Sequence, residues 1–172
     1  LSRYSGKTDI AVGSPVAGRH YPDVEKMIGL FVNTLVLRTE IDSSLSFTDN
    51  LKSVRATCLE AYEHQDLPFE QLLETLNVER DTSRTPLFQV MYDMSVDDGS
   101  TDLEFKDCSI EVLPWQAHTA KFEISLNINQ TADQLECLFN YNTDLFNSEA
   151  IERLALDFQE LLIDVSQAAD AP

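Results

Sequence analysis

The three histidines are the residues of this sequence best suited to acid–base chemistry, and one of them, His64, stands two residues before Asp66. A general base must be held near its substrate by an orienting partner. His64 falls at the end of one predicted helix and Asp66 at the start of the next, so we interpret the pair as organising a turn. His20 and His118 are solitary, and no His or Cys spacing matches a metal site. The sequence therefore predicts no catalytic residue and no metal ligand.

A polar pair, Asn33 and Thr34, lies within the apolar run 27–37. Burying an amide without a partner is costly, so some group must hydrogen-bond the Asn33 side chain. Two interpretations are open. Neighbouring backbone groups hold the side chain, or it forms a polar wall beside a substrate channel.

Two further segments combine turn-forming and charged residues. Residues 13–19 contain two glycines and leave a predicted strand. A loop of this kind could bind phosphate, but residues 13–19 lack the spacing and the following helix of a phosphate-binding loop, which argues against that role. Arg80, Asp81 and Arg84 surround two small hydroxyl residues and precede a proline, which suits a loop pinned by charge-assisted hydrogen bonds. We favour a structural clamp there over substrate contact.

Apolar periodicity predicts three helices that would position these residues. The first runs from about 47 to 64 and has one apolar face. The second follows at once, with Pro68 in its first turn, where a missing N–H costs nothing. The third runs from about 148 to 167. The predicted amino-terminal caps are, in order, Ser46 (with Asp49 three residues later), Asp66 and Asn147.

Alternating or continuous apolar residues predict the strands. They cover residues 9–13, 30–37, 88–94, 110–112 (weaker), 122–129 and 135–141. The nearly continuous run 30–37 is typical of a strand buried on both faces. The last two strands should form a hairpin with one buried face, and 97–102 is predicted to be a surface loop. The order of strands and helices indicates an α/β lobe with a mixed β-sheet packed with helices.

Composition limits the class of protein. With 172 residues and 43% hydrophobic content, the chain can form one core. Its net charge of -18 argues against nucleic acid and membrane surfaces as partners. Cys58, Cys108 and Cys137 are expected to be small buried residues in a reducing compartment. The absence of a signal segment or an apolar span predicts a cytoplasmic location. The start at Leu1, without an initiator Met, suggests a piece of a longer polypeptide.

Three ordered segments carry a family resemblance. They are Ile-Gly-Leu-Phe-Val-Asn-Thr at 28–34, His-Gln-Asp-Leu-Pro-Phe-Glu at 64–70 and Arg-Asp-Thr-Ser-Arg-Thr-Pro-Leu-Phe at 80–88. In order and approximate spacing they resemble signatures of the condensation domains of nonribosomal peptide synthetases. The resemblance extends from Asp9 through the closing helix. The chain departs mildly at Thr85, where the family often has Asn.

The resemblance implies a chloramphenicol-acetyltransferase-like fold of two similar lobes with a channel between them. Phosphopantetheine arms of donor and acceptor carrier proteins would enter the channel, and the acceptor amine would attack the donor thioester. The family's catalytic His lies in a His-His-x-x-x-Asp-Gly motif, and this sequence has no adjacent His pair. Residues 1–172 are therefore predicted to be the C-terminal subdomain, inactive alone, with no cofactor bound directly.

The resemblance also assigns roles to individual residues. Ser14 and Arg19 are predicted to line the channel. The resemblance also favours a channel-lining role for Asn33. The structural members of the three signatures are predicted to be Gly29, Asp66, Pro68, Arg80, Asp81 and Arg84.

The predicted partners are the N-terminal condensation subdomain, the donor and acceptor carrier proteins and an adjoining adenylation domain. Two alternatives remain. One is a non-catalytic module that recognises carrier proteins. The other is an epimerization-type lobe, against which the Phe-Val-Asn-Thr form of residues 31–34 argues, since it is similar to peptide-bond-forming domains.

Overall fold

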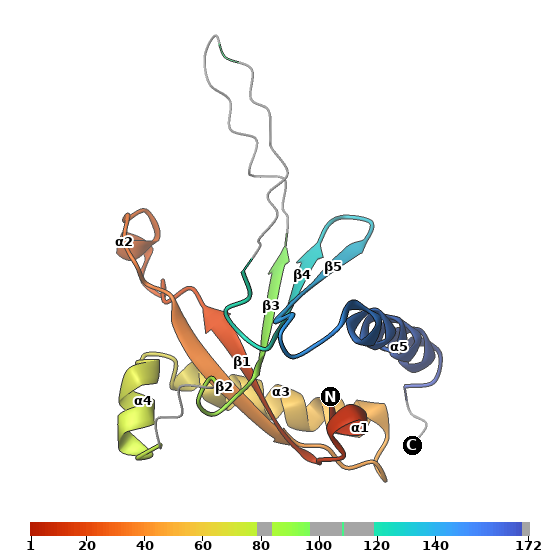
Figure 1. Ribbon diagram of the computed structural model, residues 1–172. Helices are drawn as coiled ribbons and strands as arrows, with labels where there is room; N and C mark the ends of the chain where they lie inside the picture. The colour runs from red at the N-terminus through yellow and green to blue at the C-terminus, as the bar shows by residue number, and fades with distance from the viewer. Residues whose placement is uncertain (79–83, 97–107, 109–118, 170–172) are drawn as a thin grey trace.

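The computed structural model describes residues 1–78, 84–96, 108 and 119–169, and within them it forms one five-stranded sheet in the order β2-β1-β3-β4-β5 (Figure 1). The central strands β1, β3 and β4 run parallel, and each edge strand pairs antiparallel with its neighbour. The mixed sheet expected from the sequence is confirmed. The strands are β1 (Asp9–Val16), β2 (Asn33–Glu40), β3 (Val90–Val96), β4 (Ile124–Gln130) and β5 (Leu135–Tyr141).

Helices contact the sheet near its two edges. α3 and α4 lie against β2, and α5 lies beside β5 (Figure 1). A backbone hydrogen bond from Thr48 N–H to the Ala169 carbonyl, at 3.0 Å, joins the start of α3 to the end of the α5 segment. The helices are α1 (Ser2–Ser5), α2 (Pro22–Glu25), α3 (Phe47–Glu63), α4 (Phe69–Thr75) and α5 (Ser148–Gln167).

Two of the three predicted helix caps are confirmed. Asp49 N–H donates to Ser46 Oγ at 3.1 Å at the start of α3. Ala150 N–H donates to Asn147 Oδ1 at 2.8 Å at the start of α5. The prediction that Asp66 caps α4 is wrong. The N-cap residue of α4 is Pro68, whose side chain makes no capping hydrogen bond.

The register of the ladders separates the sheet into two faces, because paired residues point to the same side and neighbours in a strand to opposite sides. Tyr92, Leu126 and Phe139 are paired across β3, β4 and β5, and the Phe139 ring meets the Phe158 ring of α5 at 6.3 Å. We call this the helix-covered face. The opposite side of β3–β5 carries Met91, Leu138 and a group of polar residues. These are Asp93, Ser95, Ser125, Asn127, Asn129, Glu136 and Asn140, and we call this side the polar face.

Tyr92 gives further support for this assignment. Burial raises the pKa of its phenol, with smaller contributions from neighbours that include Cys137 of β5 and Tyr62 of α3. Groups from both α3 and β5 therefore surround one strand residue on the helix-covered face. A half-buried tyrosine in such a place contributes mainly apolar packing.

The core of the described residues is centred on Phe88, which is 1% exposed. Its ring lies 5.8 Å from that of Phe69 and 5.6 Å from that of Phe122. Gly13 belongs to the same packing, because a Cβ at Gly13 would overlap the Phe88 ring. The remaining buried apolar residues are Leu35, Met91, Ile124, Ile128 and Ile151.

Several sequence predictions are corrected by the structure. The run 30–37 is not a strand buried on both faces: β2 begins at Asn33, forms an edge of the sheet and buries only Leu35. Cys108 and Cys137 are exposed rather than buried. The predicted 122–129 strand begins at Ile124. The weak strand at 110–112 and the loop at 97–102 lie outside the described residues.

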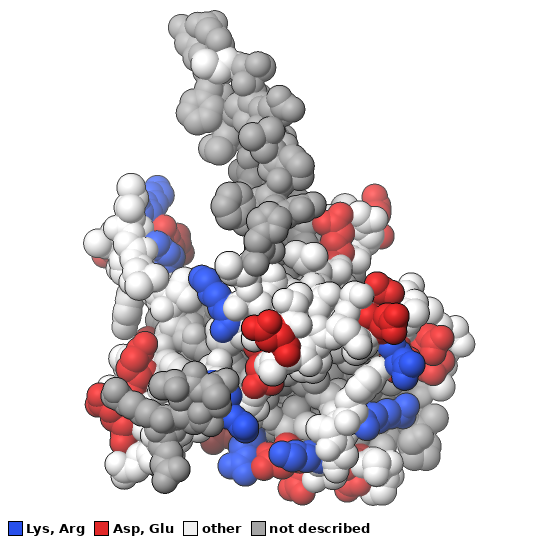
Figure 2. All heavy atoms as spheres, viewed as in Figure 1, with Lys and Arg blue, Asp and Glu red and all other residues white. Residues whose placement is uncertain are grey.

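Acidic and basic side chains are interspersed on the face drawn in Figure 2. Among the described residues, Arg38 pairs with Asp9 and Lys52 with Asp49, each at 2.7 Å. None of the helices in the described residues is long and apolar enough to cross a bilayer.

Candidate functional site

Arg19 organises the segment that joins β1 to β2. Its guanidinium donates to carbonyl oxygens along this segment, including those of Met27 at 2.8 Å and Gly29 at 3.5 Å. The guanidinium carbon also lies 4.4 Å from the centroid of the Phe31 ring, a cation–π geometry. The planar fork of Arg19 is thus used to hold a loop, as such forks often are. Its predicted channel-lining role stays a prediction.

The same segment exposes large apolar side chains. Ile28 and Leu30 are 104% and 92% exposed, and Met27 and Val32 are more than half exposed. We call these four residues the apolar loop. Figure 1 shows α2 and its loop projecting beyond the β1–β2 ladder. Sequence reasoning missed this surface because an apolar run predicts burial but does not say against which partner.

Asn33 connects the first signature to the second. Its side-chain nitrogen donates to the carbonyl oxygens of Gln65 and Leu67, each at 2.8 Å. Its oxygen accepts the Phe69 N–H at 3.1 Å. The neighbouring-backbone interpretation therefore accounts for every polar atom of this side chain. A role for Asn33 beside a channel stays a prediction.

Asp66, also in the second signature, pairs with His20 rather than capping α4. The distance from His20 Nε2 to Asp66 Oδ1 is 3.1 Å. The sequence suggested that His20 is solitary, and this contact shows that it is not. The Asp66 side chain is 83% exposed, so the pair is a surface link between the β1–α2 loop and the α3–α4 turn. Periodicity gave no signal for this contact between distant segments.

Ser14 lies within β1, which continues to Val16 where the sequence predicted an exit from the strand. It pairs with Leu35 of β2, and the register places it on the helix-covered face. The β1–β2 ladder also pairs Val16 with Asn33, so Ser14 and Asn33 lie at one end of this ladder and Arg19 lies in the segment that follows β1. Their common location is consistent with one functional region.

The remaining signature residues make local contacts or lie outside the described part, and their structural role stays a prediction. The Gly29 carbonyl accepts from Arg19, and a Cβ at Gly29 would crowd the Phe31 ring at 2.9 Å. Pro68 ends the turn before α4. Arg80 and Asp81 lie outside the described residues. Arg84 is exposed and engaged in an interaction.

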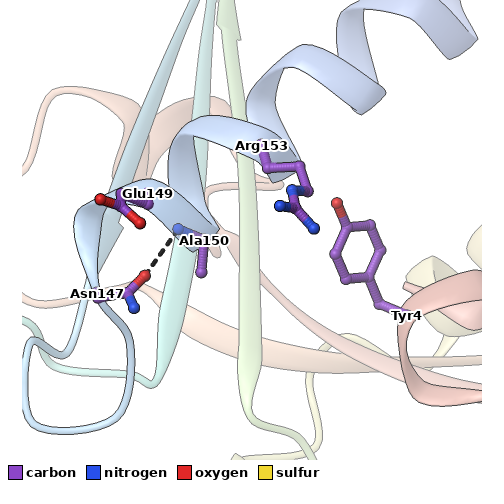
Figure 3. Close-up of a pocket in the computed structure, with 5 residues that line it drawn as sticks. All are labelled: Tyr4, Asn147, Glu149, Ala150 and Arg153. Atoms are coloured by element: carbon purple, nitrogen blue, oxygen red, sulfur yellow. Dashed lines mark hydrogen bonds between the residues drawn. The ribbon is translucent and has the colours of Figure 1, made fainter.

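A shallow pocket of about 240 Å³ lies at the start of α5, lined by Tyr4, Asn147, Glu149, Ala150 and Arg153 (Figure 3). None of the predicted site residues lines it. In the close-up, Asn147 points to the Ala150 backbone, which it caps, and Arg153 and Tyr4 lie on the opposite wall. Among the described residues, no three His, Cys, Asp or Glu side chains are arranged to hold a metal ion.

The chain belongs to the condensation domain family, whose model matches residues 1–172. It is 42% identical to tyrocidine synthase 3 of Brevibacillus parabrevis, over 99% of this chain and 3% of that protein. It is 43% identical to surfactin synthase subunit 1 of Bacillus subtilis (strain 168), over 100% of this chain and 5% of that protein. The chain thus spans only a few per cent of the length of these relatives.

Solved structures share the fold. The X-domain from teicoplanin biosynthesis aligns with a TM-score of 0.91 and 25% identity, over 99% of this chain and 39% of that one. The condensation domain of the monacolin K polyketide synthase MokA aligns with a TM-score of 0.81 and 20% identity, over 98% of this chain and 39% of that one. The expected chloramphenicol-acetyltransferase-like lobe is confirmed by these neighbours.

Proposed function

We propose that this chain is the C-terminal subdomain of a condensation domain and forms one wall of the channel in which an amide bond joins two carrier-tethered substrates. The whole-chain match to the condensation domain family carries the proposal. The two-fifths share of the aligned condensation-domain structure fits one subdomain of two. In this reaction the acceptor amine attacks the donor thioester carbonyl, and the thiol of the donor arm leaves.

The contribution of this chain is alignment rather than proton transfer. An uncharged amine is already a competent nucleophile, and holding both reactants in one channel supplies several kcal/mol of the barrier reduction. The catalytic His is assigned to a His-His-x-x-x-Asp-Gly motif in the N-terminal subdomain. His20 and His64 are assigned structural roles, because His20 pairs with Asp66 and His64 ends α3.

The apolar loop supports an N-terminal subdomain as a partner. Exposed apolar side chains gathered in one segment mark interaction surfaces in soluble proteins. Ile28 and Leu30 are almost entirely exposed, although Arg19 holds the backbone around them in a fixed form. A preformed loop loses little conformational freedom when it is buried, which favours association.

Further partners follow from the proposal. Donor and acceptor carrier proteins would present their substrates on phosphopantetheine arms, which this chain would meet as part of the substrate. An adenylation domain would adjoin it, as one of the structural neighbours is a four-domain nonribosomal peptide synthetase bound to AMP and glycine. A cytoplasmic location belongs to the same proposal.

A recognition module is the second candidate function. The X-domain from teicoplanin biosynthesis is known in a complex with OxyB, and that structure aligns with this chain at a TM-score of 0.88. The epimerization-type alternative has less support, because the Phe-Val-Asn-Thr form of residues 31–34 argues against it.

The experiment uses the complete condensation domain from the parent polypeptide, with aminoacyl groups loaded on donor and acceptor carrier proteins. We expect a new amide on the acceptor carrier, loss of product when the upstream second His is changed to Ala, and retained product for His64→Ala. Carrier binding without product would favour the recognition module. Exchange of the α-hydrogen into solvent without a new amide would favour epimerization. Dependence of turnover on His64 would contradict the proposal.

A further inference from the structure

A long-range side-chain hydrogen bond holds α1 to α5. The Tyr4 hydroxyl donates to Asp157 Oδ2 at 2.6 Å, across 153 positions of the sequence. A hydroxyl that donates to a carboxylate at such a distance forms a charge-assisted hydrogen bond, roughly twice as strong as a neutral one. This hydrogen bond raises the pKa of Tyr4, and desolvation is the second cause of the rise. The hydroxyl therefore stays protonated, and able to donate, throughout the neutral pH range.

The packing around α1 is otherwise loose. The helix is four residues long and buries none of its side chains. A helix this short is marginal in water without tertiary contacts. The shallow pocket lies between Tyr4 and the start of α5, so the two helices are not closely packed there (Figure 3). Gly6 follows α1 in the left-handed conformation, at φ 67°, with no atom within 4 Å of the place of a Cβ. The backbone can therefore pivot at Gly6.

The two partners of this hydrogen bond belong to differently anchored parts of the molecule. Asp157 is an exposed residue of α5, next to Phe158, whose ring meets the Phe139 ring of β5 at 6.3 Å. The end of the α5 segment is also bonded to the start of α3. Asp157 is thus fixed to the body of the lobe, whereas Tyr4 is on the segment that leads into β1.

Arg153 lies close to the same hydroxyl but does not replace Asp157. It is one turn earlier on α5, and its charge opposes the rise in the pKa of Tyr4. A guanidinium carries only hydrogen-bond donors, so it cannot accept the hydrogen of the Tyr4 hydroxyl. The contact between α1 and α5 therefore depends on the Asp157 carboxylate as its acceptor.

We propose that the Tyr4–Asp157 hydrogen bond is a latch that fixes the orientation of the N-terminal subdomain against this lobe. The inference rests on the proposed function, in which that subdomain precedes this chain and is connected to the sheet through α1. A channel between two subdomains aligns two reactants only while their relative orientation is held. When the latch opens, α1 pivots at Gly6 and the alignment is lost. Tyr4 and Asp157 are positioning residues, and neither touches a substrate.

The test compares variants of the complete condensation domain by amide hydrogen exchange and small-angle X-ray scattering. Tyr4→Phe removes only the hydroxyl. Exchange at residues 4–6 should become about threefold to tenfold faster, because their N–H groups donate within α1 and depend on its docking. The radius of gyration should rise, because the subdomains sample more orientations. Tyr62→Phe is the matched control, since Tyr62 is also an exposed tyrosine on a helix, and it should change neither measurement.

The acceptor is tested in the same way. Asp157→Ala should reproduce both effects of Tyr4→Phe, and the double variant should show no more than either single variant. Asp164→Ala, which removes another exposed acid of α5, should leave exchange and scattering unchanged. Strictly additive effects of Tyr4→Phe and Asp157→Ala would overturn the proposal. So would faster exchange throughout the core strands, because the contact would then hold the whole fold.

The scattering experiment separates the latch from a merely local role. Faster exchange at residues 4–6 with an unchanged radius of gyration would overturn the proposal, because the hydrogen bond would then order α1 alone. Neither measurement needs turnover. If the unaltered domain forms no amide, the proposed function fails, while a raised radius of gyration in Tyr4→Phe would still support the latch.

Discussion

The side-chain oxygen of Asn33 accepts the backbone N–H of Phe69 at 3.1 Å, so a residue at the start of β2 caps helix α4 from a distant part of the chain. Side-chain caps usually come from the residue that precedes the helix. Here that residue is Pro68, which has no hydrogen-bonding side chain. The first and second signatures are therefore coupled through one amide.

Replacing Asn33 should destabilise the fold. Asn33→Ala removes three hydrogen bonds and leaves the Gln65 and Leu67 carbonyl oxygens and the Phe69 N–H to find water. We expect a loss of about 2–3 kcal/mol in the free energy of unfolding, measured by chemical denaturation. Asn33→Asp keeps the cap acceptor but sets a carboxylate oxygen against the Gln65 and Leu67 carbonyl oxygens, so it should lose at least as much. Asn127→Ala serves as the control, and an equal effect of both alanine variants would contradict the structural role.

The fold was largely predictable from the sequence because its elements have strong local patterns. Helix α3 and its Ser46 cap, helix α5 and its Asn147 cap, and the β4–β5 hairpin all follow from periodicity and capping chemistry. These signals depend only on residues close together in the chain.

The site was less predictable, because its contacts join distant segments. The bond from Asn33 to the α3–α4 turn and the His20–Asp66 pair have no local pattern. The apolar loop was misassigned for a related reason. Ile28 has the same hydrophobicity whether it packs inside its own chain or against another surface, so its exposure had to come from the structure.

Gly13 should not tolerate a side chain. A Cβ at this position would overlap the Phe88 ring, which is held by Phe69 and Phe122. Gly13→Ala is expected to cost about 1–3 kcal/mol of stability, because overpacking forces a buried ring to move. A double-mutant cycle with Phe88→Leu checks the cause. The cost of Gly13→Ala should be smaller in the Phe88→Leu background, and strictly additive effects would show that the contact is not responsible.

Arg19 should control the order of the loop more than the stability of the fold. Arg19→Lys keeps the charge but loses the planar fork that reaches the Met27 and Gly29 carbonyls and covers Phe31. We expect faster amide hydrogen exchange at residues 20–32, with little change in the core strands. Amide formation by the complete domain should fall as the loop loosens. Lys26→Ala is the matched control, and unchanged exchange in Arg19→Lys would contradict the clamp.

Acid should weaken the fold through carboxylates that are hydrogen-bonded in the native state. Hydrogen bonds from Arg38 lower the pKa of Asp9, and those from Lys52 and then Ser46 lower the pKa of Asp49. A folded-state pKa below the unfolded one means that the folded chain binds fewer protons. The stabilisation is then complete above the unfolded pKa, about 3.9 for Asp, and is lost as pH falls through the lowered folded values.

The Asp9–Arg38 pair offers the cleanest measurement of this effect. Its two hydrogen bonds, at 2.9 and 2.7 Å, form a bidentate contact on the surface, so the effect should be small and reduced by salt. Unfolding free energies measured from about pH 6 down to about pH 3 should fall less steeply in Asp9→Asn than in the unaltered chain. Arg38→Gln should flatten the curve similarly, because it removes the same partner. If neither single variant flattened the curve, the pH dependence would have to come from groups other than this pair.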